Sequence, residues 1–146
     1  MTGPNLARIL VTGSRSWPDP QLLAGILLDT WHDTLQDGYD GMLLTHGAAE
    51  DGADTLADIW AHNHGIPTDP HPADWPGPCT SDCPPDHRRR TRGRNYCPWA
   101  GHRRNQEMID LAPLLVVGFS HQNSRGTADC LRRARKAGIS TRVITA

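Results

Sequence analysis

The sequence predicts an α/β fold with a doubly wound, mostly parallel Rossmann-like sheet of about five strands. Three observations favour this fold. Short apolar runs alternate along the chain with longer segments whose apolar residues recur at helical spacing. The first apolar run ends in a glycine turn, which suits a buried strand of a parallel sheet. The length of 146 residues suits one domain with a sizeable core, so we expect residues 1–146 to form a single domain.

The expected elements follow in order along the chain. The first strand is the apolar, β-branched run 9–12. The first helix begins at Pro20, since Asp19 suits the N-cap and proline the first turn, and it ends before Gly38. The remaining elements are a strand over 42–45, a helix over 52–64, a strand over 66–71, a helix over 101–110, a strand over 114–119, a helix over 126–137 and a strand over 142–144.

Residues 76–100 interrupt this alternation. The stretch is rich in proline, cysteine and arginine, and no helical or strand period continues through it. An irregular connection of this length inside a compact domain is either functional or disordered. We therefore expect a cysteine- and arginine-rich insertion after the third strand.

The charge balance and the chain start restrict the class of protein. A formal net charge of −1 gives no argument for a nucleic acid or a membrane surface as partner. The N-terminal residues lack the basic and apolar pattern of a signal peptide, and the longest apolar run is too short to span a bilayer. A cytoplasmic protein without membrane contact is expected, and its cysteines should be reduced.

The insertion carries residues that suit a metal. Cys79, Cys83, His87 and Cys97 supply thiolates and an imidazole at spacings compatible with a tetrahedral structural zinc site, and His102 is the alternative fourth ligand. A metal would order a segment that has little apolar surface to bury. The alternative is a disordered loop whose cysteines are incidental.

Three loops at the expected carboxyl edge of the sheet suit an anion. The first is Gly13-Ser14-Arg15, the second is the stretch 46–54, and the third is the stretch 124–127. Small residues allow close backbone approach, and helix N-termini present free N–H groups. Each loop alone is explained by packing and capping, but three at one edge favour a nucleotide-sized ligand. Neither a Walker loop nor the glycine pattern of a dinucleotide fold is present.

The order of these motifs resembles a known family. Val-Thr-Gly-Ser-Arg-Ser-Trp at 11–17 is followed by His-Gly-Ala-Ala-x-x-Gly-Ala-Asp at 46–54, Pro-Ala-Asp-Trp at 72–75, Gly-His-Arg-Arg-Asn-Gln-Glu-Met at 101–108 and Gly-Thr at 126–127. This order is similar to the YspA-like branch of the SLOG superfamily and extends over nearly the whole chain. The resemblance implies a single SLOG-like domain with a Rossmann-like sheet and a pocket for nucleotides or their derivatives. Carried over by position, the pocket residues are Gly13, Ser14, Arg15, His46, Gly47, Ala48, Gly52, Asp54, Arg104, Asn105, Gly126 and Thr127.

One departure from the superfamily bears on catalysis. Relatives of the LOG type, which hydrolyse nucleoside monophosphates, carry Pro-Gly-Gly-x-Gly-Thr-x-x-Glu. Here the glycine pair is absent, Cys130 stands at the glutamate position, and Asp129 lies one position early, in a different direction on a helix. A sensor or sequestering module that binds without turnover is therefore favoured, with the catalytic residues left unassigned.

Other functions remain open from the sequence. A nucleotide-processing hydrolase or transferase would use Asp54, His46 or Asp129 as acid or base. The arginines of the stretch 88–94, near Tyr96, are interpreted first as a lid over the pocket and second as a single-stranded nucleic-acid contact. A homo-oligomer is compatible with the fold, but no interface can be predicted. The tryptophans at 17 and 75 follow strands, and each could flank a base or lie in the core.

Overall fold

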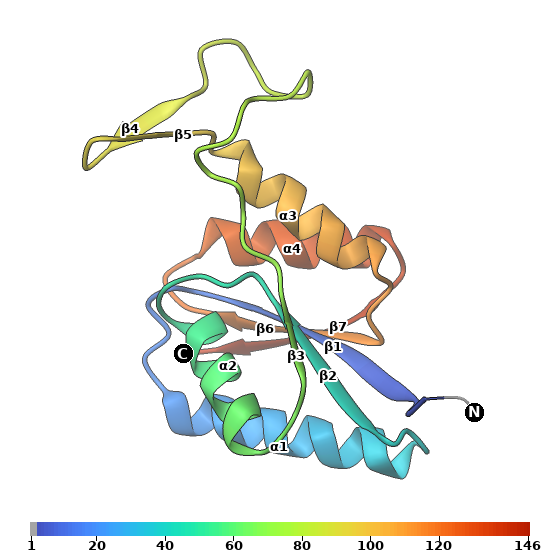
Figure 1. The fold of residues 1–146 in the computed structure, drawn as a ribbon. Coiled ribbons are helices and arrows are strands. Elements are labelled where there is room, and N and C mark those ends of the chain that lie inside the picture. Colours follow the sequence, from blue (N-terminus) through green and yellow to red (C-terminus); the bar gives the residue numbers. More distant parts are fainter. Residues whose placement is uncertain (1–2) are drawn as a thin grey trace.

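The computed structural model describes residues 3–146 and contains the expected alternation of strands and helices (Figure 1). The elements are β1 (Leu6–Gly13), α1 (Pro20–Gln36), β2 (Gly41–His46), α2 (Ala53–Asn63), β3 (Thr68–Pro70), β4 (Arg89–Thr91), β5 (Arg94–Tyr96), α3 (Trp99–Asp110), β6 (Leu115–Ser120), α4 (Arg125–Lys136) and β7 (Ser140–Thr145). The predicted fold class is confirmed.

Five strands form one parallel sheet in the order β3-β2-β1-β6-β7. Helices α1 and α2 cover one face of this sheet, and α3 and α4 cover the other (Figure 1). The chain leaves β1 towards β2 on one side and later returns to place β6 on the opposite side. Ligands of such sheets bind at the carboxyl ends of the strands where the winding reverses, which here is between β1 and β6.

The middle of the central strand β1, from Ile9 to Val11, is apolar because both faces of the sheet are covered there. Ile9 and Val11 are buried in the core beneath α1 and α2, while Leu10 is buried between the sheet and the opposite helices with Met108 and Cys130. Alternate side chains of a strand point to opposite faces, so a run that is covered on both faces is apolar at successive positions.

The first helix is bounded as its sequence predicts. The Asp19 side chain caps it by accepting a hydrogen bond of 3.0 Å from the Leu22 amide, and Pro20 occupies the first turn. At its other end Gly38 has φ +95°, a left-handed conformation that glycine adopts without strain. Among the helices of residues 3–146, none is both long and apolar enough to cross a membrane.

The insertion differs from its expected irregular structure. Strands β4 and β5 pair as a short antiparallel hairpin, and this hairpin projects away from the α/β body (Figure 1). A second difference is the start of α3, which begins at Trp99, two residues before the predicted start.

Candidate functional site

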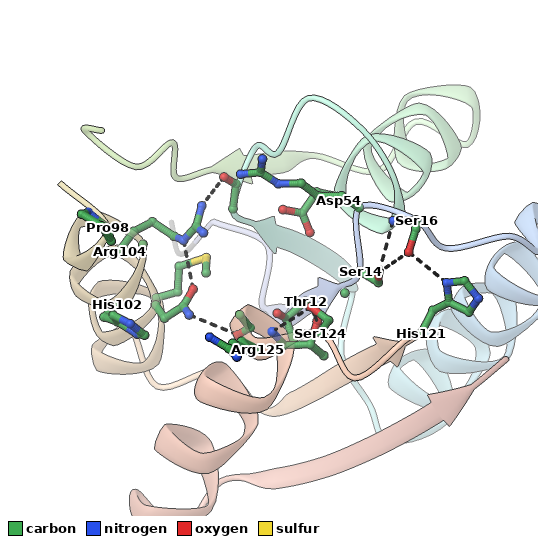
Figure 2. A pocket seen from close by; sticks show the side chains of 18 of the residues that line it. Thr12, Ser14, Ser16, Asp54, Pro98, His102, Arg104, His121, Ser124 and Arg125 are labelled. Carbon is green, nitrogen blue, oxygen red and sulfur yellow. Dashed lines mark hydrogen bonds between the residues drawn. The ribbon is translucent and has the colours of Figure 1, made fainter. Parts of the chain in front are cut away.

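A cavity of about 560 Å³ lies at the carboxyl edge of the sheet, at the point where the winding reverses (Figure 2). It is bounded by the ends of β1 and β2, by α3, and by the loop from β6 to the start of α4. Its lining includes nine of the twelve predicted pocket residues, namely Gly13, Ser14, Arg15, Gly47, Asp54, Arg104, Asn105, Gly126 and Thr127. Three others, His46, Ala48 and Gly52, do not line it.

The three residues outside the lining shape the loop between β2 and α2. The Nδ1 atom of His46 accepts a hydrogen bond of 3.0 Å from the Ala48 amide, so its Nε2 atom carries the proton that faces Asp58 at 2.8 Å. Gly52 has φ +80°, and a Cβ there would lie 2.3 Å from the Ser14 carbonyl oxygen. This glycine therefore serves close packing against the loop that follows β1.

The N-terminus of α2 is bonded to another part of the protein. The Ala53 amide donates to the Ser14 carbonyl at 3.1 Å, and a Cβ on Gly13 would lie 2.4 Å from the Ala53 Cβ. The first turn of α2 is thus packed directly against the end of β1. The expectation that this helix N-terminus presents free N–H groups is therefore wrong for its first amide.

Asp54 lies in this first turn and points into the cavity (Figure 2). Its Oδ2 atom accepts a hydrogen bond of 3.2 Å from the Ala49 amide, while its buried Oδ1 atom has no partner among the described residues. Burial raises the pKa of this carboxyl above its ordinary value, although the Ala49 amide and the charges of His46 and Arg104 oppose that shift. A buried polar atom without a partner is costly, which makes it a natural contact for a ligand donor.

Arg104 joins α3 to the end of β2. Its guanidinium donates to the carbonyls of Gly47 and His71, and its Nε atom donates to the Asn105 side chain at 3.0 Å. Its side chain is therefore partly committed to the protein and closes one wall of the cavity.

The N-terminus of α4 forms the opposite wall. Ser124 caps the helix, since its hydroxyl accepts from the Thr127 amide at 3.4 Å, and its carbonyl accepts the first intrahelical bond, from Ala128. The amides of Arg125 and Gly126 precede that bond and have no intrahelical partner. The side chains of Arg15 and Arg125 also line the cavity, so this wall combines a positive helix end with guanidinium groups.

Asp129 is buried, but it is bonded throughout. It receives Asn105 at 3.0 Å, His102 at 3.1 Å, Arg132 at 2.6 Å and Arg133 at 2.9 Å. Burial raises the pKa of this carboxyl, but the bonds from Arg133, Asn105 and His102 outweigh burial and hold the pKa below its ordinary value. Asp129 therefore positions Asn105 and His102, which do line the cavity, and does not face a ligand.

Sequence reasoning missed several residues of the lining. His121 follows β6 directly, and its Nδ1 atom lies 2.9 Å from the Ser16 hydroxyl, which lies 2.9 Å from that of Ser14 (Figure 2). The position after a central strand could have identified His121. The two tryptophans that the sequence left between a base contact and a core position differ. Trp75 lines the cavity, while Trp17 is buried and packs edge-on against Phe119, with 5.2 Å between the ring centroids.

The predicted metal ligands come together in the insertion. One ligand atom from each of Cys79, Cys83, His87 and Cys97 lies within 4.8 Å of the others. The Cys83 and Cys97 sulfurs are 3.7 Å apart, close to the roughly 3.8 Å that two thiolates span across a tetrahedral zinc ion. His102 is bonded to Asp129 instead, which leaves His87 as the fourth member. The cluster is compatible with a metal.

Arginines surround the thiols of this cluster. Arg88 donates to the Cys79 sulfur at 3.3 Å, and Arg103 donates to the sulfurs of Cys83 at 3.3 Å and Cys97 at 3.6 Å. Burial raises the pKa of the Cys97 thiol, but the bonds from Arg103 and the neighbouring thiols outweigh it and bring the pKa to about 7. These donors favour the thiolate form, which is the form that binds a metal.

The expected lid over the cavity is not present. The five arginines of the stretch 88–94 are absent from the cavity lining, to which the residues from 72 to 100 contribute Trp75 and Pro98. The arginine-rich hairpin and the cavity are therefore separate features of the molecule.

The structure is a Rossmann-like α/β fold with a cavity at the switch point of its sheet. The chain belongs to the YspA, cpYpsA-related SLOG family, whose model matches residues 7–76. It is also similar to the "Gene 61 protein" of Mycobacterium phage D29, with 34% identity over 139 residues that cover 92% of this chain and 93% of that protein. The family match ends before the first cysteine of the insertion, whereas the similarity to the phage protein covers most of the chain.

Proposed function

We propose that this protein binds a nucleotide or a nucleotide-derived small molecule in the cavity at the carboxyl edge of its sheet, as a sensor or sequestering module. The observation that carries the proposal is the polarity of the cavity. One wall holds the α4 N-terminus with Arg15 and Arg125, and another holds the unpartnered oxygen of Asp54. Its volume of about 560 Å³ lies within the range of small-molecule sites. Membership of the SLOG family supports a nucleotide-related ligand in general, without naming a particular compound.

The polarity suggests an orientation for the ligand. Phosphate oxygens suit the amides of Arg125 and Gly126 and the guanidinium of Arg15. A hydroxyl or amino group, such as those of a ribose or a base, suits the Asp54 carboxylate. Trp75 lies against Gly101, and a Cβ added at Gly101 would lie 2.8 Å from the Trp75 ring. The ring offers an apolar wall for a base.

A nucleotide-processing hydrolase or transferase is the alternative. Of the three acid–base candidates, His46 and Asp129 have their polar side-chain atoms bonded to the protein, and Asp54 retains one unbonded oxygen. Binding without turnover is the simpler function for such a site. The two functions are separated by incubating the protein with each ligand that binds and following product by chromatography, because turnover would contradict the binding-only function.

Replacing Arg15 by Ala tests the phosphate wall. We expect the affinity for the ligand to fall about tenfold or more, because a charge-assisted contact to phosphate is lost. The fold should remain, since Arg15 is exposed. Ligands are first sought by thermal shift with nucleotides, cyclic nucleotides and ADP-ribose derivatives, and the affinities are then measured by calorimetry.

Arg142→Ala is the matched control for this experiment, because Arg142 is an exposed arginine on β7 outside the cavity lining. It should bind like the parent protein. A panel in which no compound raises the melting temperature would contradict the proposed function, and equal loss of affinity in both variants would contradict the role of Arg15.

We also propose that the cluster in the insertion holds a structural zinc ion. Three thiolates and one imidazole are a donor set that zinc prefers, and the metal would supply ordering energy to a segment with little apolar surface. Reduced thiols are the form required, which fits the cytoplasmic location that we propose for the protein.

A further inference from the structure

The arginine-rich hairpin is the most strongly charged segment of the molecule. The stretch 76–100 holds five of the fifteen basic residues of the chain but two of its sixteen acidic residues. The remainder of the chain therefore carries an excess of acidic residues. A polyanionic partner would therefore be attracted to this hairpin more than to the rest of the chain taken as a whole.

The charges of the hairpin are unneutralised. Arg89, Arg90, Arg92 and Arg94 are exposed, and within residues 3–146 none of them lies within ion-pairing distance of a carboxylate. A group of like charges on one short element is unfavourable by itself. It becomes favourable when an anionic partner supplies the missing counter-charges.

The strand register distributes these arginines around the ribbon. Arg89 pairs with Tyr96, and Thr91 with Arg94, which places Arg89 and Arg94 on one face. Arg90 pairs with Asn95 on the other face. Arg92 lies at the tip, where it and Gly93 both have positive φ, as in a tight two-residue hairpin turn. Positive charge therefore faces both sides and the end of the ribbon.

This distribution indicates the geometry of the partner. A flat anionic surface, such as a membrane or an acidic protein face, would contact only one side of the ribbon. The groove of a nucleic-acid duplex has phosphates on both sides, and the major groove of DNA admits a two-stranded β-ribbon. The nearby aromatic rings are already engaged, Tyr96 with Trp75 at 6.0 Å and Trp99 with His102 at 5.1 Å, so stacking on single-stranded bases has little support.

The base of the hairpin is held by the cysteine–histidine cluster. His87 lies two residues before β4, and Cys97 follows β5 directly, so a metal bound by these ligands would clamp both ends of the ribbon. The ribbon has no apolar core of its own that could hold it. Its rigidity therefore rests on the zinc ion proposed above.

We propose that the hairpin β4–β5 is a DNA-binding element that enters the groove of a duplex and contacts phosphates on both sides. Its binding carries little sequence preference and depends strongly on salt, because arginine–phosphate contacts release counterions. The site is distinct from the small-molecule cavity, whose lining includes none of these arginines.

The test uses the full chain as purified with its metal, a fluorescein-labelled DNA duplex of about two helical turns, and fluorescence anisotropy at several salt concentrations. The hairpin variant carries Arg90→Ala, Arg92→Ala and Arg94→Ala. Arg88 and Arg89 are left unchanged because Arg88 donates to the Cys79 sulfur and Arg89 to the His87 carbonyl. The control variant removes the same charge elsewhere, through Arg135→Ala, Lys136→Ala and Arg142→Ala, all exposed and outside the hairpin.

We expect the hairpin variant to bind duplex about tenfold or more weakly than the parent at low salt, with a shallower dependence on salt, and the control to retain most of the affinity. A single strand of the same sequence and vesicles of anionic lipid should bind more weakly than duplex. Absence of duplex binding, equal loss in both variants, or equally tight binding of the single strand or the vesicles would overturn the proposal. Zinc content is measured in parallel, so a metal-free protein that still binds duplex through these arginines supports the hairpin and contradicts the zinc proposal alone.

Discussion

Removing the proposed zinc ion from the Cys79–Cys83–His87–Cys97 cluster should increase the rate of tryptic cleavage in the hairpin by about a hundredfold while the α/β body stays folded. Structural zinc contributes a large part of the folding free energy of segments that lack a core. The two apolar clusters of the body are built from the sheet and its four helices and take no side chain from the stretch 76–98. Loss of the metal should therefore free the insertion alone, and its five arginines are sites for trypsin.

The measurement is limited proteolysis followed by mass spectrometry, with zinc content determined on the same sample and the body followed by far-UV circular dichroism. Cys83→Ser should reproduce the effect of a chelator. Cys130→Ala is the matched control, because Cys130 lies on the buried side of α4 and belongs to the core, where burial raises the pKa of its thiol to about 11. It should retain about one equivalent of zinc. A parent protein that holds no metal and yet resists trypsin would contradict the proposed centre.

The sequence predicted the elements whose local signals agree with their tertiary surroundings. The strand that contains Ile9 to Thr12 is apolar because both of its faces are covered, and the Asp19–Pro20 start of α1 depends on capping within one turn. In both cases the information lies within a few residues of the element. The clustering of Cys79, Cys83, His87 and Cys97 was also predictable, because the spacing of thiols and imidazoles in a short segment restricts how they can meet.

Other features depended on contacts that a sequence pattern does not record. The hairpin of β4 and β5 contains almost no apolar residues, so its sequence has no alternating apolar pattern that would predict strands. Its ends are brought together by His87 and Cys97. The helical spacing of Leu56, Ile59 and Trp60 predicts that all three face the core, but Ile59 is 52% exposed because the buried side of α2 is formed by other residues, among them Ala57 and Ala61.

The order of motifs indicates a region of the fold but does not indicate the role of each residue there. The order of motifs placed nine residues in the cavity lining, but it could not separate contacts with a ligand from support of the loops. His46 and Gly52 belong to the same motif as Asp54, yet their atoms are used in shaping the loop. The bonds of His46 with Ala48 and Asp58, and the close packing of Gly52 against Ser14, distinguish these residues from Asp54, and a sequence pattern does not record such contacts.

Asp54 and Asp129 are the two buried carboxylates near the cavity, and substitution by Asn should change stability in opposite directions. Asp54 has an unpartnered oxygen, so Asp54→Asn removes a poorly compensated charge and should raise the free energy of unfolding by about 1 kcal/mol, roughly 4 °C in melting temperature. Asp129 accepts from four side chains, so Asp129→Asn should lower the free energy of unfolding by about 3 kcal/mol.

The pH dependence of these changes follows from the pKa shifts. The pKa of Asp54 is raised in the folded state, so the parent protein loses stability as the pH rises through that value, and the gain in Asp54→Asn is present at neutral pH. It should vanish below the unfolded-state value of 3.8, where the carboxyl is protonated in both states. The pKa of Asp129 is lowered, so its contribution is present at neutral pH and is lost as the pH falls through its folded-state value.

Measuring ligand affinity distinguishes a role of Asp54 in binding from an unpartnered oxygen that has no function. If the free Asp54 oxygen accepts from a ligand hydroxyl or amino group, the more stable Asp54→Asn variant should bind about a hundredfold more weakly, because the new amide presents a donor to a donor. Denaturant unfolding at several pH values and calorimetry with the tightest compound of the panel measure the two quantities on the same protein. A gain in stability with unchanged affinity would show that the orphan oxygen is a cost of packing, whereas a gain in stability with lost affinity would show that the fold retains this carboxylate for its ligand.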